Sequence, residues 1–417
     1  MTRDTATPVR PARHRGRWMA ALLCAASVAG AVLAPSATAS GRGHGSTPSP
    51  TSVHHTATSV HHTAPGHPWA AERAARQAVR RVTGAGLPGA IALVRDHGRT
   101  ATAAAGYADV AAKRPMTSSD HLRIGSNTKV FTATVVLQLV AEHRLSLDDT
   151  VQHVLPGIIH GGGRITVRQL LNHTSGLPGF EQDPASMAPY LRGDAGYYWS
   201  PRKLVALADS HARLFAPGTK FSYSNTNYFL LGLIIEKVTH RSYEQELNRR
   251  IIMPLGLHDT RLPLRTLKIQ NPAVHGYMLG RPGHAPRDIT FGISPSTTWA
   301  AGALTSTVND LARFDKALIT GRLLPKAQLA EMTKPGPFTV DPADRTKGYG
   351  LGLEKLTLCG VTMWGHTGTV LGTQTNAFIS ADGTRQLVLA TNADPDTWSA
   401  DQISAWLTAS RTTLCVP

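Results

Sequence analysis

The sequence predicts an α+β fold in which an antiparallel sheet, flanked by helices, is built from both chain ends around an inserted all-α region. Strand-like apolar runs occur before residue 110 and again after residue 300, whereas residues 148–290 show helical stretches separated by glycine and proline. A hydrophobic content of 41% over 417 residues is enough for a large core. We therefore expect one folded domain over residues 68–417, with the helical insertion at about 148–290.

The first part of this domain is expected to form a helix, a hairpin and a buried helix. Apolar residues at helical spacing over 69–82 indicate an amphipathic helix. The runs 90–94 and 100–107 look like two strands joined by a tight turn. After Gly125 the chain is apolar on nearly every side of a helix, which is the pattern of a buried helix. Ser126 is therefore expected in the first turn of a central helix.

The remaining elements are expected in chain order. The helical stretches of the insertion are 167–171, 201–211, 228–239 and 243–252. Strand-like runs return at 302–305, 348–353, 361–364, 373–380 and 386–391, and a last helix is expected over 401–413. The active cleft is expected where sheet and insertion meet, which is a common location for ligand pockets.

The N-terminal residues look like an export signal followed by a spacer. Residues 1–39 combine several arginines with an apolar run too short for a stable membrane span, and Ala37-Thr38-Ala39 offers a cleavage site. Residues 40–67 contain almost no large apolar side chains and cannot build a core. We expect a cleaved signal peptide over 1–39, a disordered linker over 40–67 and a secreted mature protein. The paired histidines of the linker could bind a transition metal loosely, but a flexible spacer is favoured and no metal or cofactor is expected.

The net charge narrows the possible partners. The net charge of +16 favours contact with anionic cell-wall polymers or plain solubility; it does not indicate nucleic-acid binding, because the basic residues are scattered and not clustered with aromatics. We expect no nucleic-acid partner, no membrane contact after signal cleavage and a monomer.

In an oxidising compartment Cys359 and Cys415 are expected to form a disulfide, the alternative being two unpaired buried thiols.

A first candidate for chemistry is the pair Ser126 and Lys129, whose spacing puts both side chains on one face of a helix. A serine hydroxyl is a poor nucleophile until a base takes its proton, and burial turns a lysine into such a base by disfavouring its charge. The same spacing occurs at Ser200 and Lys203, but Pro201 at the first helical position indicates an ordinary N-cap there.

Two further clusters complete the set. Tyr223-Ser224-Asn225 lies in a loop before an apolar helix, where a phenol could pass protons if a nearby ammonium lowers its pKa, and Asn225 could hold a substrate amide. In His366-Thr367-Gly368-Thr369 the glycine allows close approach of a substrate backbone, and the threonine hydroxyls could bind a carboxylate. The backbone N–H groups of Ser126 and Thr369 could form an oxyanion hole. The alternatives are a packed loop tyrosine with a helix-capping asparagine, and a strand end with polar turn residues.

These clusters, in this order, resemble those of the penicillin-recognising serine transferases and hydrolases. Within that superfamily the chain is similar to the branch that holds D-alanyl-D-alanine carboxypeptidases, class C β-lactamases and related esterases. Further matches occur at 106–109, 145–149, 170–178 and 348–353. His366 stands where most of the superfamily carries lysine, as in the secreted D-alanyl-D-alanine carboxypeptidases of filamentous soil bacteria. The resemblance implies a β-lactamase/transpeptidase-like fold.

The resemblance also implies roles. Ser126 would be the nucleophile, Lys129 and Tyr223 would move protons, with the choice of base left open, and the substrate would be held by Asn225, His366, Thr367, Gly368 and Thr369. Trp299 either lines the cleft or belongs to the core. The implied reaction is cleavage between two terminal D-alanines of a peptidoglycan stem peptide, by hydrolysis or transpeptidation, with β-lactams as alternative ligands. A β-lactamase, a short-chain esterase and a non-catalytic wall-binding module are the alternatives, and the intact catalytic set argues against the last.

Overall fold

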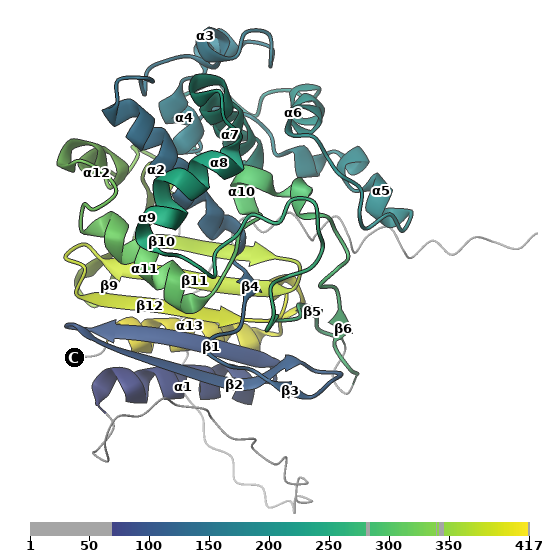
Figure 1. Ribbon diagram of the computed structural model, residues 1–417, viewed down its shortest axis with the longest axis vertical. Coiled ribbons are helices and arrows are strands. Elements are labelled where there is room, and N and C mark those ends of the chain that lie inside the picture. The colour runs from purple at the N-terminus through teal and green to yellow at the C-terminus, as the bar shows by residue number, and fades with distance from the viewer. Residues whose placement is uncertain (1–68, 281–283, 339, 342–345, 416–417) are drawn as a thin grey trace, which may run out of the picture.

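A computed structural model describes residues 69–280, 284–338, 340–341 and 346–415. The signal peptide predicted over 1–39, the linker predicted over 40–67 and its paired histidines lie outside these residues. Within the described ranges, a large antiparallel sheet is covered by helices on both faces (Figure 1).

The sheet has eight strands in the order β3-β2-β1-β12-β11-β10-β9-β8, and every neighbouring pair is antiparallel. The N-terminal strands lie directly beside the C-terminal ones, with Ala90 of β1 opposite Thr391 of β12 (Figure 1). The predicted fold class is therefore confirmed: both chain ends build one sheet. The strand bounds are β1 Gly89–Asp96, β2 Arg99–Asp109, β3 Arg114–Pro115, β8 Lys347–Tyr349, β9 Glu354–Leu358, β10 Val361–Val370, β11 Thr373–Ser380 and β12 Arg385–Thr391.

Helices cover both faces of the sheet, which explains why the central strands β11 and β12 are buried along almost their whole length. Helices α1 (Ala70–Gly84) and α13 (Ala400–Leu414) share a core with Ala90, Ala92 and Val94 of β1. The alternate residues Ile91 and Leu93 belong to the core of the opposite face, where α2 (Thr128–Ala141) and α11 (Val308–Ile319) lie. This alternation is the expected period of two in a strand.

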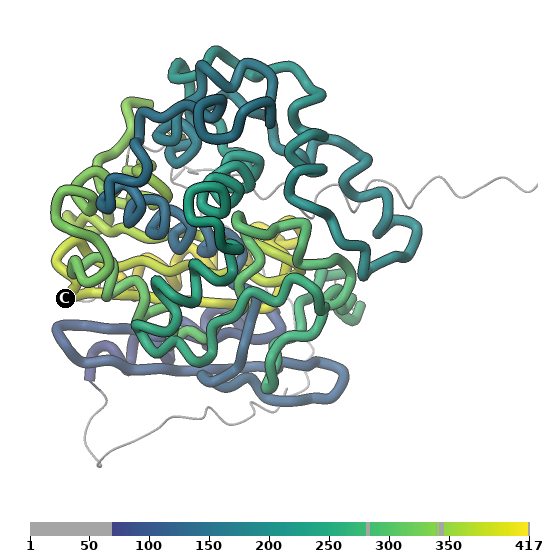
Figure 2. The backbone as a smooth tube through the Cα atoms, turned by 45° about the horizontal axis from the view of Figure 1, so that its top comes forward, coloured from purple at the N-terminus to yellow at the C-terminus, as the bar shows by residue number. Residues whose placement is uncertain are grey.

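The inserted region lies against the α2 side of the sheet, as the blue-green tube in Figure 2 shows. The helices expected within it are present, except that the one predicted over 243–252 ends at Leu247 and continues as a π-helical turn over Asn248–Ile252. A short hairpin of β5 (Tyr277–Met278) and β6 (Arg287–Asp288) was not expected. The helix bounds are α3 Val151–Val154, α4 Val167–Leu171, α5 Ala188–Leu191, α6 Pro201–Asp209, α7 Asn225–Thr239, α8 Tyr243–Leu247 and α9 Met253–Leu255.

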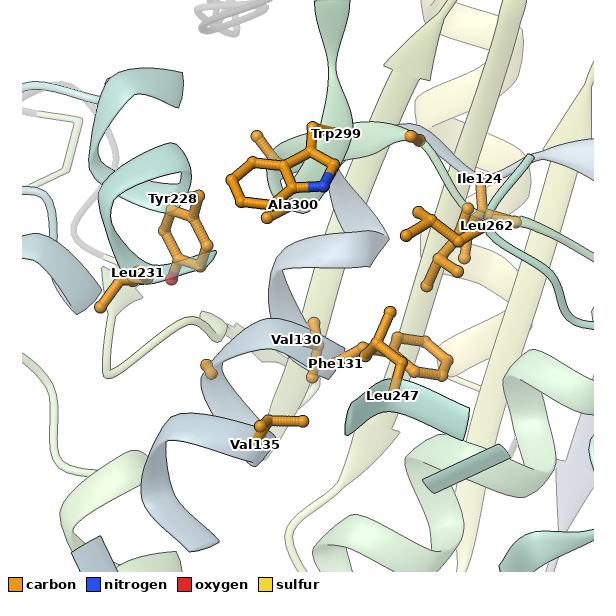
Figure 3. Packing of buried hydrophobic residues seen from close by; sticks show 14 of the residues in the cluster. Ile124, Val130, Phe131, Val135, Tyr228, Leu231, Leu247, Leu262, Trp299 and Ala300 are labelled. Carbon is orange, nitrogen blue, oxygen red and sulfur yellow. The ribbon is translucent and has the colours of Figure 1, made fainter. Parts of the chain in front are cut away.

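Helix α2 is the centre of the larger core. It is buried on all sides, as its sequence predicts. Phe131 stacks on Phe314 of α11 with 3.6 Å between ring centroids. Its threonine hydroxyls are satisfied inside the core, since Thr132 donates to the Ala300 carbonyl oxygen and Thr134 donates to the Val130 carbonyl oxygen. Figure 3 shows residues of α7, α8 and α10 closing around it.

Two of the expected strands are corrected. Residues 302–305 were predicted as a strand, but Trp299–Gly302 forms a short helix, α10, because its alanines pack closely against α7. Only Thr305–Ser306 (β7) pairs, with β4 (Leu122–Arg123). In the run 348–353 the strand ends at Tyr349, and a turn with Gly352 at φ +85° follows.

A disulfide joins Cys359, between β9 and β10, to Cys415 after α13, across a sequence separation of 56 residues. The bond ties the C-terminal helix to the strands β9 and β10, and β10 carries the third motif cluster, His366-Thr367-Gly368-Thr369. Within the described part of the chain, we find no helix with the length and apolar character needed to cross a membrane.

Candidate active site

Ser126 lies in a 3-10 turn, Gly125–Asn127, that leads into α2 and packs against β10. The first residue of this turn has a φ of +52°, and a Cβ atom there would lie 2.8 Å from the backbone nitrogen of Thr369. A Cβ atom on Gly368 would lie 2.1 Å from the carbonyl oxygen of Ile124. Both positions therefore need glycine, and this close approach sets Ser126 beside the third motif cluster.

Lys129 is fully buried one helical turn after Ser126, and its Nζ atom lies 3.0 Å from Ser126 Oγ. Nζ also lies 2.7 Å from Asn225 Oδ1 and 2.8 Å from the carbonyl oxygen of Ala301. Burial lowers the pKa of Lys129 to about 7. The amide and carbonyl oxygens can only accept, so they take the two N–H bonds of a neutral amine, whose lone pair then faces the serine hydroxyl. Lys129 is thus placed to accept the serine proton.

Tyr223 reaches the same atoms from the loop before α7. Its hydroxyl is near enough to the Ser126 side chain for Ser126 to act against the rise of the Tyr223 pKa, and Lys129 Nζ lies 4.8 Å from the Tyr223 ring centroid. We expected a nearby ammonium to lower the pKa of Tyr223. Instead burial raises that pKa well above its usual range, because a phenolate would lose its solvation. The phenol therefore stays protonated around neutral pH.

Asn225, the first residue of α7, joins Lys129 to a carboxylate that the sequence analysis did not single out. Its Nδ2 atom donates to Glu181 Oε1 at 3.3 Å. The other carboxylate oxygen, Oε2, is buried and has no hydrogen-bond partner among the described residues. Burial raises the pKa of Glu181 to about 7, although the nearby Lys129 acts to lower it. Asn225 thus lies in the site, with both ends of its amide engaged.

The strand β10 passes Ser126 with part of one edge open. Its pairing with β9 ends where Gly365 lies opposite Glu354. Beyond that point Glu354 Oε1 accepts a hydrogen bond from the Thr367 N–H at 3.2 Å and from the Thr367 hydroxyl at 2.7 Å. The sequence predicted Thr367 in the site, but it did not reveal that a carboxylate from the neighbouring strand binds both of its donors.

The backbone of Thr369 has the orientation that the predicted oxyanion hole requires. Alternate N–H groups of a strand point to the same edge, so the Thr369 N–H points outward like that of Thr367. Its nitrogen lies against the turn that carries Ser126. The Thr369 hydroxyl, in contrast, donates to Gln374 Oε1 on β11. The oxyanion hole of Ser126 and Thr369 stays a prediction that this arrangement permits.

His366 is buried behind the open edge. Its Nε2 atom lies 3.0 Å from the Tyr349 hydroxyl, and its Nδ1 atom lies 2.5 Å from the Thr367 carbonyl oxygen and 3.2 Å from Glu354 Oε1. Two acceptors at Nδ1 require the proton there, so Tyr349 donates to Nε2. Burial lowers the pKa of His366, which keeps the imidazole neutral. His366 therefore does not supply a positive charge to the cleft.

Trp299 belongs to the core and does not line the cleft. Its side chain is 3% exposed and packs edge-to-face on Phe229 and Tyr243. Figure 3 shows it among the buried apolar residues, above α2. Of the two interpretations of Trp299, the core one is therefore supported. Its helix α10 still contributes to the site, because the Ala301 carbonyl accepts from Lys129.

Sequence reasoning also missed a histidine. His173 lies just after the end of α4, at φ +60°, and its imidazole is buried behind Tyr223 with 4.3 Å between ring centroids. Its Nδ1 atom accepts from the Ser224 N–H at 3.2 Å. Burial lowers its pKa well below the usual range, so it forms a neutral support for the Tyr223 ring. No cluster of His, Cys, Asp and Glu in the described ranges is arranged to hold a metal ion.

The chain is similar to several known proteins. The family model described as Beta-lactamase matches residues 44–409. Penicillin-binding protein 4* of Bacillus subtilis (strain 168) is 30% identical over 238 residues, which is 53% of this chain, and the chain spans only 50% of the length of that relative.

Two solved structures match over greater lengths. The D-stereospecific amidohydrolase from Streptomyces sp. has a TM-score of 0.73 and 40% identity, with 80% of this chain and 98% of that chain covered. The D-amino acid amidase from Ochrobactrum anthropi SV3, complexed with L-phenylalanine amide, has a TM-score of 0.72 and 28% identity, with 82% and 99% covered. The chain therefore belongs to the Beta-lactamase family, as a serine hydrolase of that fold related to penicillin-binding proteins and D-amino acid amidases.

Proposed function

We propose that this protein is a serine amidohydrolase that opens the amide or peptide bond of a D-amino acid residue through an acyl-enzyme on Ser126. The observation that carries the proposal is the 3.0 Å contact between Ser126 Oγ and the Nζ atom of the buried Lys129, whose pKa is about 7. Nucleophilic catalysis by serine needs such a base. The preference for D-residues is supported by the similarity to the D-stereospecific amidohydrolase and the D-amino acid amidase.

In the proposed mechanism, neutral Lys129 takes the Ser126 proton as Oγ attacks the substrate carbonyl carbon. The oxyanion that forms accepts from the N–H groups of Ser126 and Thr369, and one such donor is worth about 2.7–4 kcal/mol of barrier. As the C–N bond breaks, the leaving nitrogen takes a proton from the Tyr223 hydroxyl, and Lys129 returns its proton to Tyr223. Water then opens the ester by the reverse sequence of proton transfers, which restores Ser126 and releases the acid.

We assign the base to Lys129 and not to Tyr223. Burial brings the pKa of Lys129 down to about 7 but moves that of Tyr223 up. A base is most effective when its pKa lies near the working pH. Tyr223 is better suited to donate, since its phenol stays protonated until the amine leaves.

The test uses the two Ser-x-x-Lys pairs of the chain. Ser126→Ala should lower kcat/KM for D-phenylalanine amide by about 10³-fold or more. Ser200→Ala is the matched control, because Ser200 has the same spacing to Lys203 but caps α6, where its side chain accepts from the Lys203 N–H. Equal turnover of the D- and L-amides by the wild type would contradict the D-preference, and full activity of Ser126→Ala would contradict the nucleophile.

A secreted D-alanyl-D-alanine carboxypeptidase or transpeptidase acting on peptidoglycan stem peptides is the second candidate. The open edge of β10 beside Ser126 suits an extended peptide, and the penicillin-binding relative favours this class. A peptide ending in D-Ala-D-Ala and a fluorescent penicillin, applied to the same variants, test it. Rapid release of the penicilloyl group would indicate a β-lactamase, and turnover of nitrophenyl esters alone an esterase. N-terminal sequencing of protein recovered from culture medium tests the predicted cleavage after Ala39.

A further inference from the structure

Glu354 lies where the open edge of β10 begins and takes part in no catalytic step proposed above. It is the first residue of β9, and its Oε1 atom accepts from both donors of Thr367. His366 Nδ1 lies 3.2 Å from the same oxygen. The carboxylate therefore occupies donors that a substrate carboxylate at this edge would otherwise use.

The charge of Glu354 is not cancelled by a bonded cation. Its imidazole neighbour His366 is neutral, and among the described residues Glu354 forms no ion pair with a lysine or arginine. The side chain is 21% exposed, so an incoming substrate can reach it. Its charge also extends to the reacting groups, because together with Glu181 it opposes the effect of burial on the pKa of Lys129.

Glu354 therefore disfavours a substrate group that only accepts hydrogen bonds at this edge and favours one that donates them. A substrate carboxylate near Thr367 would face a second carboxylate at close range, and like charges repel strongly where protein partly excludes solvent. A primary amide or an ammonium group would instead offer N–H donors to Glu354, as in a charge-assisted hydrogen bond. The expectation that the threonine hydroxyls bind a carboxylate holds only if Glu354 moves away.

We propose that Glu354 makes the leaving-group side of the cleft selective for neutral or cationic amines and against amines that carry a carboxylate. The inference rests on the proposed function, an acyl-enzyme formed by Ser126 at a D-residue amide, and it adds the class of leaving group. It predicts a preference for amides and carboxyl-blocked peptides over peptides with a free C-terminal residue next to the scissile bond.

Two substrates with the same acyl group measure this selectivity: D-Ala-D-Ala amide and D-Ala-D-Ala with a free carboxylate. In the wild type, kcat/KM for the amide should exceed that for the free dipeptide by about tenfold or more at low ionic strength. The ratio should decrease as salt is added, because the carboxylate is partly exposed. Glu354→Gln keeps an oxygen for Thr367 and removes the charge, so it should bring the ratio down by about tenfold.

Glu244→Gln is the control, since Glu244 is exposed on α8 and loses the same charge away from the cleft. A Glu354→Gln ratio equal to the wild-type ratio, or a wild-type preference for the free carboxylate, overturns the proposal. If Glu354→Gln fails to fold, the salt dependence decides, and a wild-type ratio that salt does not change overturns it.

A second pair of substrates separates this inference from the proposed function. Phenyl and m-carboxyphenyl esters of one acyl group report acylation of Ser126 whatever the stereochemistry of the acyl part. If no D-alanyl substrate is turned over, the proposed function fails, but the ester ratio in wild type and Glu354→Gln still tests Glu354. An m-carboxyphenyl ester that reacts as fast as the phenyl ester in the wild type overturns the inference by itself.

Discussion

The site around Ser126 has a helical side and a strand side, here called the helical wall and the strand wall, and the two treat charge differently. On the helical wall, Lys129 is fully buried, and burial brings the pKa of both Lys129 and Glu181 to about 7. On the strand wall, Thr367 and Glu354 are partly exposed, and their hydrogen bonds lie at an edge that a substrate can reach. The difference teaches that proton transfer is placed on the buried helical wall, called the dry wall below, and substrate selection on the partly exposed strand wall.

The dry wall has an energetic cost. Lowering the pKa of Lys129 from 10.5 to about 7 corresponds to about 5 kcal/mol against the charged form, at 1.36 kcal/mol per unit. The large apolar core around α2 and α7 allows the fold to bear this cost.

The largest effect is expected from Lys129→Met, which removes the base and keeps an unbranched side chain. We expect kcat/KM for a D-aminoacyl amide to fall by about 10³-fold or more. Lys203→Met, in the second Ser-x-x-Lys pair, is the matched control and should not change the rate. A loss of less than about tenfold in Lys129→Met would place the base elsewhere.

The same variant tests the electrostatics of the dry wall through stability. Because the folded-state pKa of Lys129 is lowered, the cost of its buried ammonium is fully present below pH 7 and declines as pH rises from 7 toward 10.5. Lys129→Met has no ammonium group and therefore lacks this cost. Its Tm minus the wild-type Tm should therefore decrease between pH 6 and pH 9 in calorimetry. A difference that is constant over this range would contradict the lowered pKa.

A smaller effect is expected from Tyr223→Phe, which keeps the ring against His173 and removes the proton donor. We expect kcat/KM to fall by about 10²-fold, with amide substrates affected more than esters because an amine leaving group needs the proton more. Tyr228→Phe is the control: its ring centroid also lies near Lys129 Nζ, at 5.5 Å, but its hydroxyl donates to the Leu171 carbonyl. That control should cost about 1 kcal/mol of stability. Equal rate losses in the two variants would mean that packing and not the Tyr223 hydroxyl matters.

Most of the sheet could be predicted from the sequence because its signals are local. The hairpin of β1 and β2 follows from runs bounded by turn residues, and its observed strands extend the predicted ones by one or two residues at each end. The strand β11 has the predicted bounds. The strand predicted at 302–305 is wrong at its start, because Gly302 ends the short helix α10, whose Ala300 packs on α7, and this tertiary contact outweighs local preference. Only Thr305 of the predicted stretch pairs, in β7. The strand β9 was missed because its residues are only half-buried and lack an apolar run.

The site could be predicted in part for the same reason. Ser126 and Lys129 are linked by helical spacing, and residues 366–369 lie together in one strand, so short sequence motifs are enough to predict these residues as part of the site. Glu181, Glu354 and His173 enter the site through loop paths and strand pairing that no spacing encodes. Glu354, for example, reaches Thr367 only because β9 stops pairing with β10 at Gly365. The two missed carboxylates, Glu181 and Glu354, are the groups whose charge raises the pKa of Lys129.

The smallest effect is expected from Glu181→Gln, which probes the border between the two walls. The pKa of Lys129 and of Glu181 are both about 7, so the two groups titrate as a coupled pair, and the Glu181 carboxylate raises the pKa of Lys129. Removing that charge should let Lys129 lose its proton at lower pH. The acidic limb of the kcat/KM profile should therefore move to lower pH, and the rate at pH 6 should rise severalfold relative to the rate at pH 8. Glu244→Gln, measured alongside, should keep the wild-type profile. A limb that stays in place in Glu181→Gln, or moves to higher pH, would show that the dry wall is set by burial alone and that its carboxylate has no part in tuning the base.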